Sequence, residues 1–262
     1  YLSLFLALAT ALTVFIISYA YSRIIEYFPS GGGGYIVATH TLGENAGVVS
    51  GCALLVDYML TITVSIVSCG DAIFSFLPPE LQKFKIAFEV LAIAILVVLN
   101  LRGVKESVTI LAPIFITFVI THVLLIGYGI LKHIPSIVPM AKNIHSGFQS
   151  GLSTLGFGGL LLLFLRAFSL GGGTYTGIEA VSNGLPIMRE PRVKNGKRTM
   201  VYLAVSLAIT AGGILVCYLL LGVKPVGGRT LNAVLAAEVF SKWSLGPLIA
   251  FITIFSEGAL LL

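Results

Sequence analysis

Long apolar runs separated by short polar connections make up the pattern of this chain. A helix of about 20 apolar residues crosses a hydrocarbon core of about 30 Å. We expect seven such segments, at Tyr1–Tyr21, Gly47–Leu77, Phe84–Leu101, Val108–Leu131, Phe157–Met188, Thr199–Val223 and Gly246–Leu262. Only 10% of the 262 residues are charged, whereas soluble domains carry about 25%. The pattern therefore predicts an all-α, multi-pass membrane protein in contact with lipid. We expect it in a cell membrane, the plasma membrane of a prokaryote.

The fifth apolar segment contains its own interruption. Phe157–Pro186 as one helix would be about 45 Å long at about 1.5 Å per residue, too long to cross upright. Its centre holds three glycines in succession, Gly171–Gly173, which favour leaving the helix. Backbone groups freed at this depth must be buried in protein or line a wet cavity. The segment thus predicts a broken membrane helix at a transport site, the alternative being a glycine-rich packing face between helices.

Polar residues follow the glycine run directly. Tyr175 and Gly173 are expected to line the pathway, and Thr176 and Glu179 open the second half-helix. The N-terminus of a half-helix carries partial positive charge, while the carboxylate of Glu179 shifts the balance towards a cation or a proton. The alternative is that Glu179 only caps the half-helix.

The second segment carries a polar stripe on an otherwise apolar helix. Its members recur at helical spacing: Asp57, Thr61, Ser65, Ser68 and Asp71. Ionisable groups inside a membrane usually face a bundle interior or a cavity. Carboxylate and hydroxyl oxygens suit a hard cation. The stripe predicts a cation pathway that includes Ser65, the alternative being hydrogen bonds that join helices.

The connections predict sidedness and two further helices. Five basic residues crowd Arg189–Arg198, and dense positive charge near span ends favours the cytoplasm. Thr230–Trp243 has the spacing of an amphipathic helix that lies on the surface or caps a pathway. The longer connection Lys132–Thr154 is expected to hold a short interfacial helix.

Other functional classes find little support in the sequence. No basic run with interleaved aromatic residues indicates a nucleic acid, and no histidine pair or metal-ligand cluster indicates an enzyme, so we expect neither cofactor nor catalysis. His122 stands alone on an apolar segment, which is typical of a hydrogen-bonded interior residue rather than a proton carrier. The sequence pattern assigns no role to Glu89 or Glu257.

Several motifs together resemble those of the amino acid–polyamine–cation (APC) superfamily. FPSGGGGY at Phe28–Tyr35 is similar to the end of that superfamily's second helix. Thr176–Arg198 is similar to its sixth helix and the basic loop that follows. Within the superfamily the chain most resembles the KUP-type potassium importers of the bacterial KimA-like branch. That likeness rests on LLVDYMLTITVSI at Leu54–Ile66, LNLRGVKES at Leu99–Ser107 and the glycine-run segment at Leu165–Pro186.

The resemblance implies a fold and a site. The fold would be the LeuT type, with inverted repeats. Residues 1–262 would be a single but incomplete transmembrane transporter domain, covering about helices two to eight. The positions that match the potassium ligands of that branch are Asp57, Tyr58, Thr61, Thr176 and Glu179.

The implied function is proton-coupled potassium import by alternating access, with potassium held at this same site. An amino acid permease of the same superfamily is the alternative, and its substrate would be an amino acid. The sequence leaves the oligomeric state open, a homodimer included.

Overall fold

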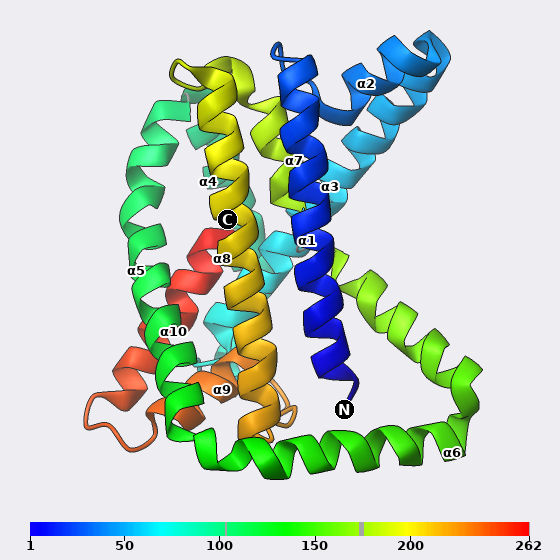
Figure 1. Ribbon diagram of the computed structural model, residues 1–262. Helices are drawn as coiled ribbons and strands as arrows, with labels where there is room; N and C mark the ends of the chain where they lie inside the picture. Colours follow the sequence, from blue (N-terminus) through cyan, green and yellow to red (C-terminus); the bar gives the residue numbers. More distant parts are fainter. Residues whose placement is uncertain (103, 173–175, 262) are drawn as a thin grey trace. The chain divides into compact units, whose positions relative to one another are not determined.

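In the computed structural model the chain is a set of helices joined by short turns (Figure 1). The structure describes residues 1–102, 104–172 and 176–261, with the side chains of 102–110 and 176 left aside. The helices in this part of the chain are α1 Leu2–Tyr27, α2 Gly33–Leu42, α3 Glu44–Phe74, α4 Lys85–Arg102, α5 Val104–Lys132, α6 Ile137–Leu170, α7 Thr176–Asn183, α8 Arg192–Leu221, α9 Leu231–Phe240 and α10 Gly246–Leu261. Short 3-10 helices occur at Pro79–Phe84, Ile134–Ser136 and Leu185–Ile187.

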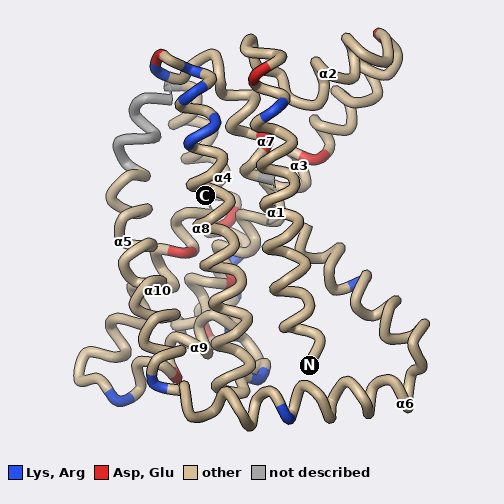
Figure 2. Tube along the Cα trace, viewed as in Figure 1, with Lys and Arg blue, Asp and Glu red and all other residues tan. Residues whose placement is uncertain are grey.

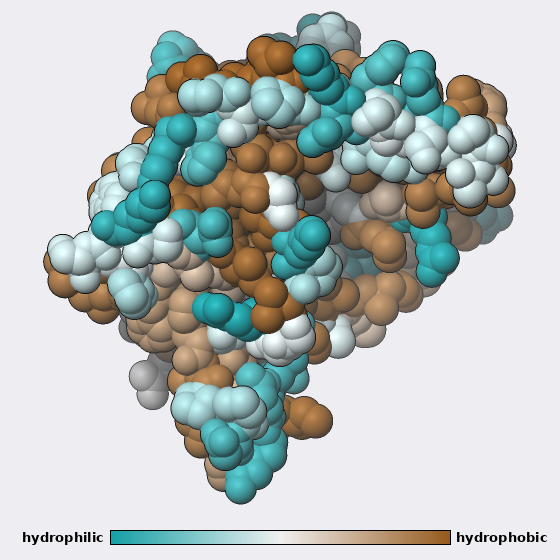
Figure 3. Space-filling model, turned by 90° about the horizontal axis from the view of Figure 1, so that it is seen from below, coloured by the Kyte–Doolittle hydropathy of each residue, from teal (hydrophilic) through white to brown (hydrophobic). Residues whose placement is uncertain are grey.

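Six of the described helices are long and apolar enough to cross a membrane. Five of them correspond to the first, second, third, fourth and sixth predicted segments, and the seventh segment is the shorter apolar helix α10. The remaining span, Ile134–Leu170, shares only residues 157–170 with the fifth predicted segment, because that segment is broken after Leu170. Large apolar side chains on these helices face outward, such as Leu8 and Leu12 of α1, which are 63% and 62% exposed. Figure 3 shows apolar residues, in brown, exposed between polar residues, in teal, in the view from below. Such a surface suits lipid, because the hydrocarbon core replaces the protein interior as the apolar solvent.

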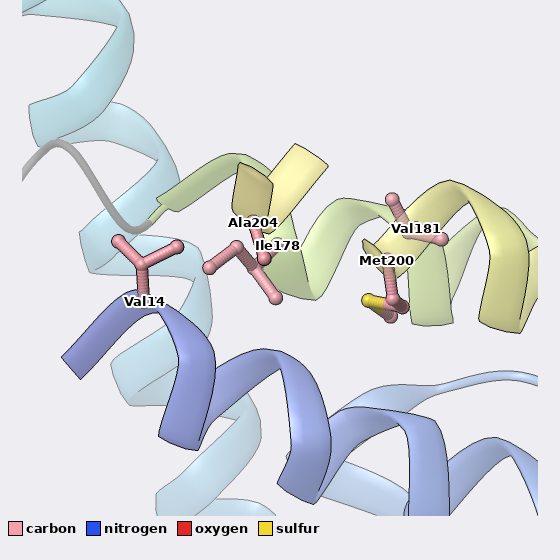
Figure 4. Packing of buried hydrophobic residues seen from close by; sticks show 5 residues of the cluster. All are labelled: Val14, Ile178, Val181, Met200 and Ala204. Atoms are coloured by element: carbon pink, nitrogen blue, oxygen red, sulfur yellow. The ribbon is translucent and has the colours of Figure 1, made fainter. Parts of the chain in front are cut away.

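The helices belong to two compact units. The first comprises Tyr1–Thr61 and Pro139–Val216, and the second comprises Ile62–Val138 and Cys217–Leu262. In the first unit α7 packs against α1 and α2. Its core cluster consists of Val14, Ile178, Val181, Met200 and Ala204, from α1, α7 and α8 (Figure 4). This cluster fixes the short helix α7 beside α1.

The second unit is built around α10. This helix packs against both α5 and α9, and α4 packs against α5. Helix α9 forms where a helix was predicted, within Thr230–Trp243, but the predicted amphipathic character and surface position are wrong. Its apolar residues Leu235, Val239 and Phe240 are buried because α9 packs against α5 and α10, so it contributes to the core of its unit.

The turn after α1 is set by proline and glycine. Phe28 lies before Pro29 and has φ −125° and ψ 69°, because a residue before proline avoids the helical region. Gly31 and Gly32 follow with φ of 83° and 93°, a region that glycine enters at little cost. The chain therefore reverses tightly into α2.

Helix α6 is two helices joined at a bend. Gly156 has φ 66° and ψ 172°, which interrupts the helical conformation, and the bend is visible along α6 in Figure 1. The part after the bend starts at residue 157, where the fifth apolar segment was predicted to begin. The part before it shows that the connection predicted to hold a short helix is helical for most of its length.

Candidate functional site

The predicted interruption of the fifth apolar segment is present. Helix α6 ends at Leu170, where the Gly171 amide donates to the carbonyl of Phe168 at 3.1 Å, and α7 starts at Thr176. Residues 173–175 lie outside the described residues, so the predicted pathway positions Gly173 and Tyr175 are not placed. The side chain of Thr176 is also outside the described part, although its backbone opens α7.

Glu179 lies in the first turn of α7 and is half-buried. The hydroxyl of Tyr21, on α1, lies near its carboxylate, and a Cβ atom at Gly34 would lie 3.9 Å from the Tyr21 hydroxyl and 3.8 Å from Oε1 of Glu179. A carboxylate in the first turn also interacts favourably with the partial positive charge of the helix N-terminus. Glu179 is therefore held at the start of the half-helix by a neighbouring helix as well as by its own.

The start of α2 approaches the same carboxylate. Gly33, the first residue of α2, has φ 50°, and a Cβ atom there would lie 2.9 Å from Oε1 of Glu179 and 2.7 Å from Oδ1 of Asn183. Only a glycine leaves room for this approach. A second helix N-terminus is thus brought beside the carboxylate of Glu179, which adds to the local positive potential.

Tyr58 joins α3 to α7. The side-chain amide of Asn183, the last residue of α7, donates to the Tyr58 hydroxyl at 2.5 Å. Both side chains are half-buried. The structure therefore gathers Tyr58 and Glu179, two residues predicted as ligands from distant parts of the sequence, around Tyr21 and Asn183.

We refer to Tyr21, Tyr58, Glu179 and Asn183 as the oxygen cluster. Sequence reasoning missed two of its members. Asn183 stands inside the SNGLP motif that carried the resemblance, so a signal existed, but it pointed to no role. Tyr21 has no such signal because it lies among other aromatic residues at the end of an apolar segment.

The remaining predicted residues lie along α3. Asp57 precedes Tyr58 and is exposed, Thr61 is half-buried one turn later, and Ser65 is half-buried one turn beyond that. Among the described side chains, none forms a hydrogen bond or ion pair with the Asp57 carboxylate. Asp71, at the far end of the stripe, pairs with Lys85 of α4, so a lysine already neutralises that carboxylate. The structure leaves the roles of Asp57, Thr61 and Ser65 as predictions.

The donor atoms favour a hard cation over a transition metal. The oxygen cluster offers hydroxyl, amide and carboxylate oxygens, without sulfur or imidazole. No group of three or more His, Cys, Asp or Glu side chains within the described ranges could hold a metal ion. Oxygen ligands with a single negative charge are suited to a weakly hydrated monovalent cation rather than a divalent one.

Comparison with known proteins identifies the relatives of this chain. Residues 1–259 match the family model for amino acid permeases. The potassium transporter KimA of Bacillus subtilis (strain 168) is 36% identical over 224 residues. The alignment covers 85% of this chain and 36% of KimA, so the chain spans little more than a third of that relative.

Proposed function

Because the chain belongs to the amino acid permease family of the APC superfamily, we propose that it forms part of a secondary active transporter that imports potassium together with protons. The family consists of membrane transporters, not enzymes. The helical architecture fits a fragment of the LeuT-type fold, with the broken helix formed by α6 and α7. The choice of potassium and of the proton as coupling ion is the proposal.

The observation that carries the proposal is the oxygen cluster beside the helix break. Discontinuous helices form the ion and substrate sites of such transporters. Glu179 supplies one negative charge there, and Tyr58 supplies a neutral oxygen from a second helix. With Asp57, Thr61 and Thr176 as further ligands, the site would offer a potassium ion enough oxygen to replace part of its hydration shell. The name of the relative KimA supports the same substrate.

Transport in this proposal proceeds by alternating access. One bundle of helices moves against the other around the bound ion, so that the site opens to each side of the membrane in turn. The proton gradient would drive accumulation, since a potassium ion moving with a proton gains the energy that the proton releases.

An amino acid is the second candidate substrate, because the matching family model describes amino acid permeases. In such a site the helix N-termini would receive the carboxylate of the substrate. Here the N-termini of α2 and α7 already face the carboxylate of Glu179. A second carboxylate at that place would be repelled, and this favours the cation.

The experiment is uptake by the full-length protein in a strain that lacks its own potassium importers, with a panel of amino acids tested in parallel. Glu179→Gln removes a charge and nearly keeps the shape. We expect it to lower potassium uptake by roughly tenfold or more, because hydrogen bonds and contacts to charged groups contribute about 1.5–3 kcal/mol. Asp57→Asn should act similarly. Thr61→Ala should have a smaller effect because it removes one neutral oxygen.

Uptake must be normalised to the folded protein in the membrane and measured across pH. A purely structural role would reduce the amount of protein and leave transport per molecule unchanged. Glu44→Gln is the matched control, since Glu44 is an exposed acid at the start of α3. Wild-type normalised uptake in both Glu179→Gln and Asp57→Asn would rule out the cation site. Uptake of an amino acid in place of potassium would establish the alternative.

A further inference from the structure

A second polar network lies in the other compact unit and shares no residue with the oxygen cluster. Its four members come from four helices: His122 of α5, Tyr218 of α8, Asn232 of α9 and Glu257 of α10. The two ionisable residues, His122 and Glu257, are far apart in the sequence. Ionisable groups within membrane-spanning helices are costly, and in transporters they commonly serve in ion or proton pathways.

Hydrogen bonds hold one oxygen of Glu257 in place. The Asn232 amide donates to Oε1 of Glu257 at 2.6 Å. The Tyr218 hydroxyl in turn donates to the side-chain oxygen of Asn232. This chain of donors satisfies Oε1 and orients the carboxylate, while the other oxygen, Oε2, remains directed at His122.

The protonation of His122 follows from its other partner. Its side chain is only 1% exposed, and its ring lies on that of Phe118 with centroids 3.9 Å apart. Nδ1 lies 3.0 Å from the carbonyl oxygen of Phe118. A carbonyl oxygen only accepts, so Nδ1 carries the hydrogen. In a neutral imidazole the other nitrogen, Nε2, is then a bare acceptor.

Nε2 of His122 and Oε2 of Glu257 therefore face each other as two acceptors. They are 3.6 Å apart, and both are buried without a hydrogen-bond partner among the described residues. Buried polar atoms in native proteins are nearly always hydrogen-bonded. One added proton converts this contact into a charge-assisted hydrogen bond and satisfies both atoms at once.

The other groups around the pair do not replace that proton. Cys217 lies beside Tyr218 on α8, and its thiol contacts the Ile126 carbonyl of α5 at 3.9 Å. Gly258 of α10 packs on the backbone of Cys69 of α3. Helix α9 carries one acid, Glu238, and its side chain is exposed. Within the described ranges no lysine or arginine forms an ion pair with Glu257.

We propose that His122 and Glu257 bind one proton between them and form the proton site of the transporter. The proton adds to the lone pair of Nε2 and is shared with Oε2, and it leaves again to water. Glu257 is 21% exposed at its side chain, which gives the proton access to the buried ring. The protonated pair forms a hydrogen bond that joins α5 to α10. When the proton leaves, Nε2 and Oε2 face each other as two acceptors, and the contact between the helices weakens. The two protonation states therefore favour different packings of α5 and α10.

The test separates two kinds of transport by the full-length protein in proteoliposomes. One is potassium accumulation driven by a proton gradient, and the other is potassium exchange at equal pH on both sides. Glu257→Gln keeps the acceptor for Asn232 and offers its amide to Nε2, which imitates the protonated pair permanently. Gradient-driven accumulation should fall to the level seen without a gradient, while exchange continues. His122→Gln should give the same separation, and Glu238→Gln is the matched control that changes neither.

The inference rests on the proposed proton-coupled function, so a second readout does not depend on transport. Infrared difference spectra of the purified protein between acidic and alkaline pH should contain a carboxyl or imidazole signal that Glu257→Gln removes. Wild-type accumulation in both variants would overturn the proton site, as would loss of exchange together with accumulation at normal amounts of folded protein. If the wild type moves no potassium, the proposed function fails. The infrared signal then decides the pair alone: its absence from the wild-type spectrum overturns the pair, and so does its persistence in the spectrum of Glu257→Gln.

Discussion

Asn183 is the residue through which α3 and α7 contact each other inside the oxygen cluster. Its amide donates to the Tyr58 hydroxyl at 2.5 Å, and its own oxygen lies beside Gly33. Tyr58 can offer an oxygen to a cation only if its hydroxyl is held in one direction, and an amide donor does this while leaving the oxygen lone pairs partly free. Asn183 is therefore a positioning residue for a proposed ligand.

Tyr58→Phe and Asn183→Ala should each lower the thermal stability of the purified full-length protein. A neutral hydrogen bond contributes about 1 kcal/mol. Because both variants remove the same bond, the double variant should be less destabilised than the sum of the two singles, by about 0.5–1.5 kcal/mol. Melting temperatures of the four proteins measure this coupling. Strictly additive effects would show that the two side chains act independently.

At the scale of elements, the ends of short helices place the polar residues. Helix α2 begins at Gly33 against Glu179, and Thr230, the N-cap of α9, lies against Ser75, which directly follows α3. The backbone amide of Thr230 donates to the Ser75 hydroxyl at 2.9 Å. In both cases the first residue of the helix or its cap makes the contact that fixes the element.

Gly33→Ala should abolish most folded protein or most uptake. The new Cβ would meet the oxygens of Asn183 and Glu179, and φ 50° is unfavourable for alanine by about 1–2 kcal/mol. Gly43→Ala separates the two causes, because Gly43 has φ 97° and no neighbour within 4 Å in the described part of the chain. Protein yield and normalised uptake are the measurements. Equal damage from both substitutions would mean that strain, rather than contact with the site, is responsible.

Thr230→Ala should destabilise the second unit by about 1 kcal/mol, the usual effect of losing an N-terminal cap. The Thr230 hydroxyl accepts from the amide of Ala233 at 3.2 Å, and alanine leaves that amide without its partner. The melting temperature should fall, and Thr230→Ser should restore it because serine keeps the oxygen. Failure of serine to restore stability would assign the effect to the methyl group.

At the scale of the whole molecule, each compact unit carries its own core while apolar side chains face outward. The connection from α7 to α8 and the start of α8 hold a group of Lys and Arg residues, visible in blue in Figure 2. Basic residues near span ends are retained in the cytoplasm.

Single cysteines at Lys194 and Lys83 should therefore label from opposite sides of the membrane, with Lys194 on the cytoplasmic side. Both positions are exposed. The background must first lose Cys52, which is the exposed one of the three cysteines in this chain, and any other reactive thiol. An impermeant thiol reagent applied to intact cells should modify the cysteine at position 83 only. Modification at position 194 under the same conditions would reverse the assigned orientation.

The sequence by itself determined the membrane class and most of the helices. Apolar length and glycine position are local signals, so the break after Leu170, the helix start at Thr176 and the helix at 231–240 were predicted from the order of residues alone. Helical spacing also placed Asp57 and Thr61 on one face of α3. The family followed from motifs that are continuous in the sequence, and the match over residues 1–259 confirms it.

Only the tertiary structure decided which polar groups meet. Tyr21 with Glu179, Asn183 with Tyr58 and Lys85 with Asp71 are pairs between helices, and no local pattern encodes the rotation of one helix against another. His122 illustrates the difference. On its own segment it was interpreted as an isolated interior residue, whereas packing of α5 against α10 sets its free nitrogen opposite Glu257. Whether a buried polar side chain is satisfied depends on the atoms that folding brings within hydrogen-bond distance, and those come from distant parts of the chain.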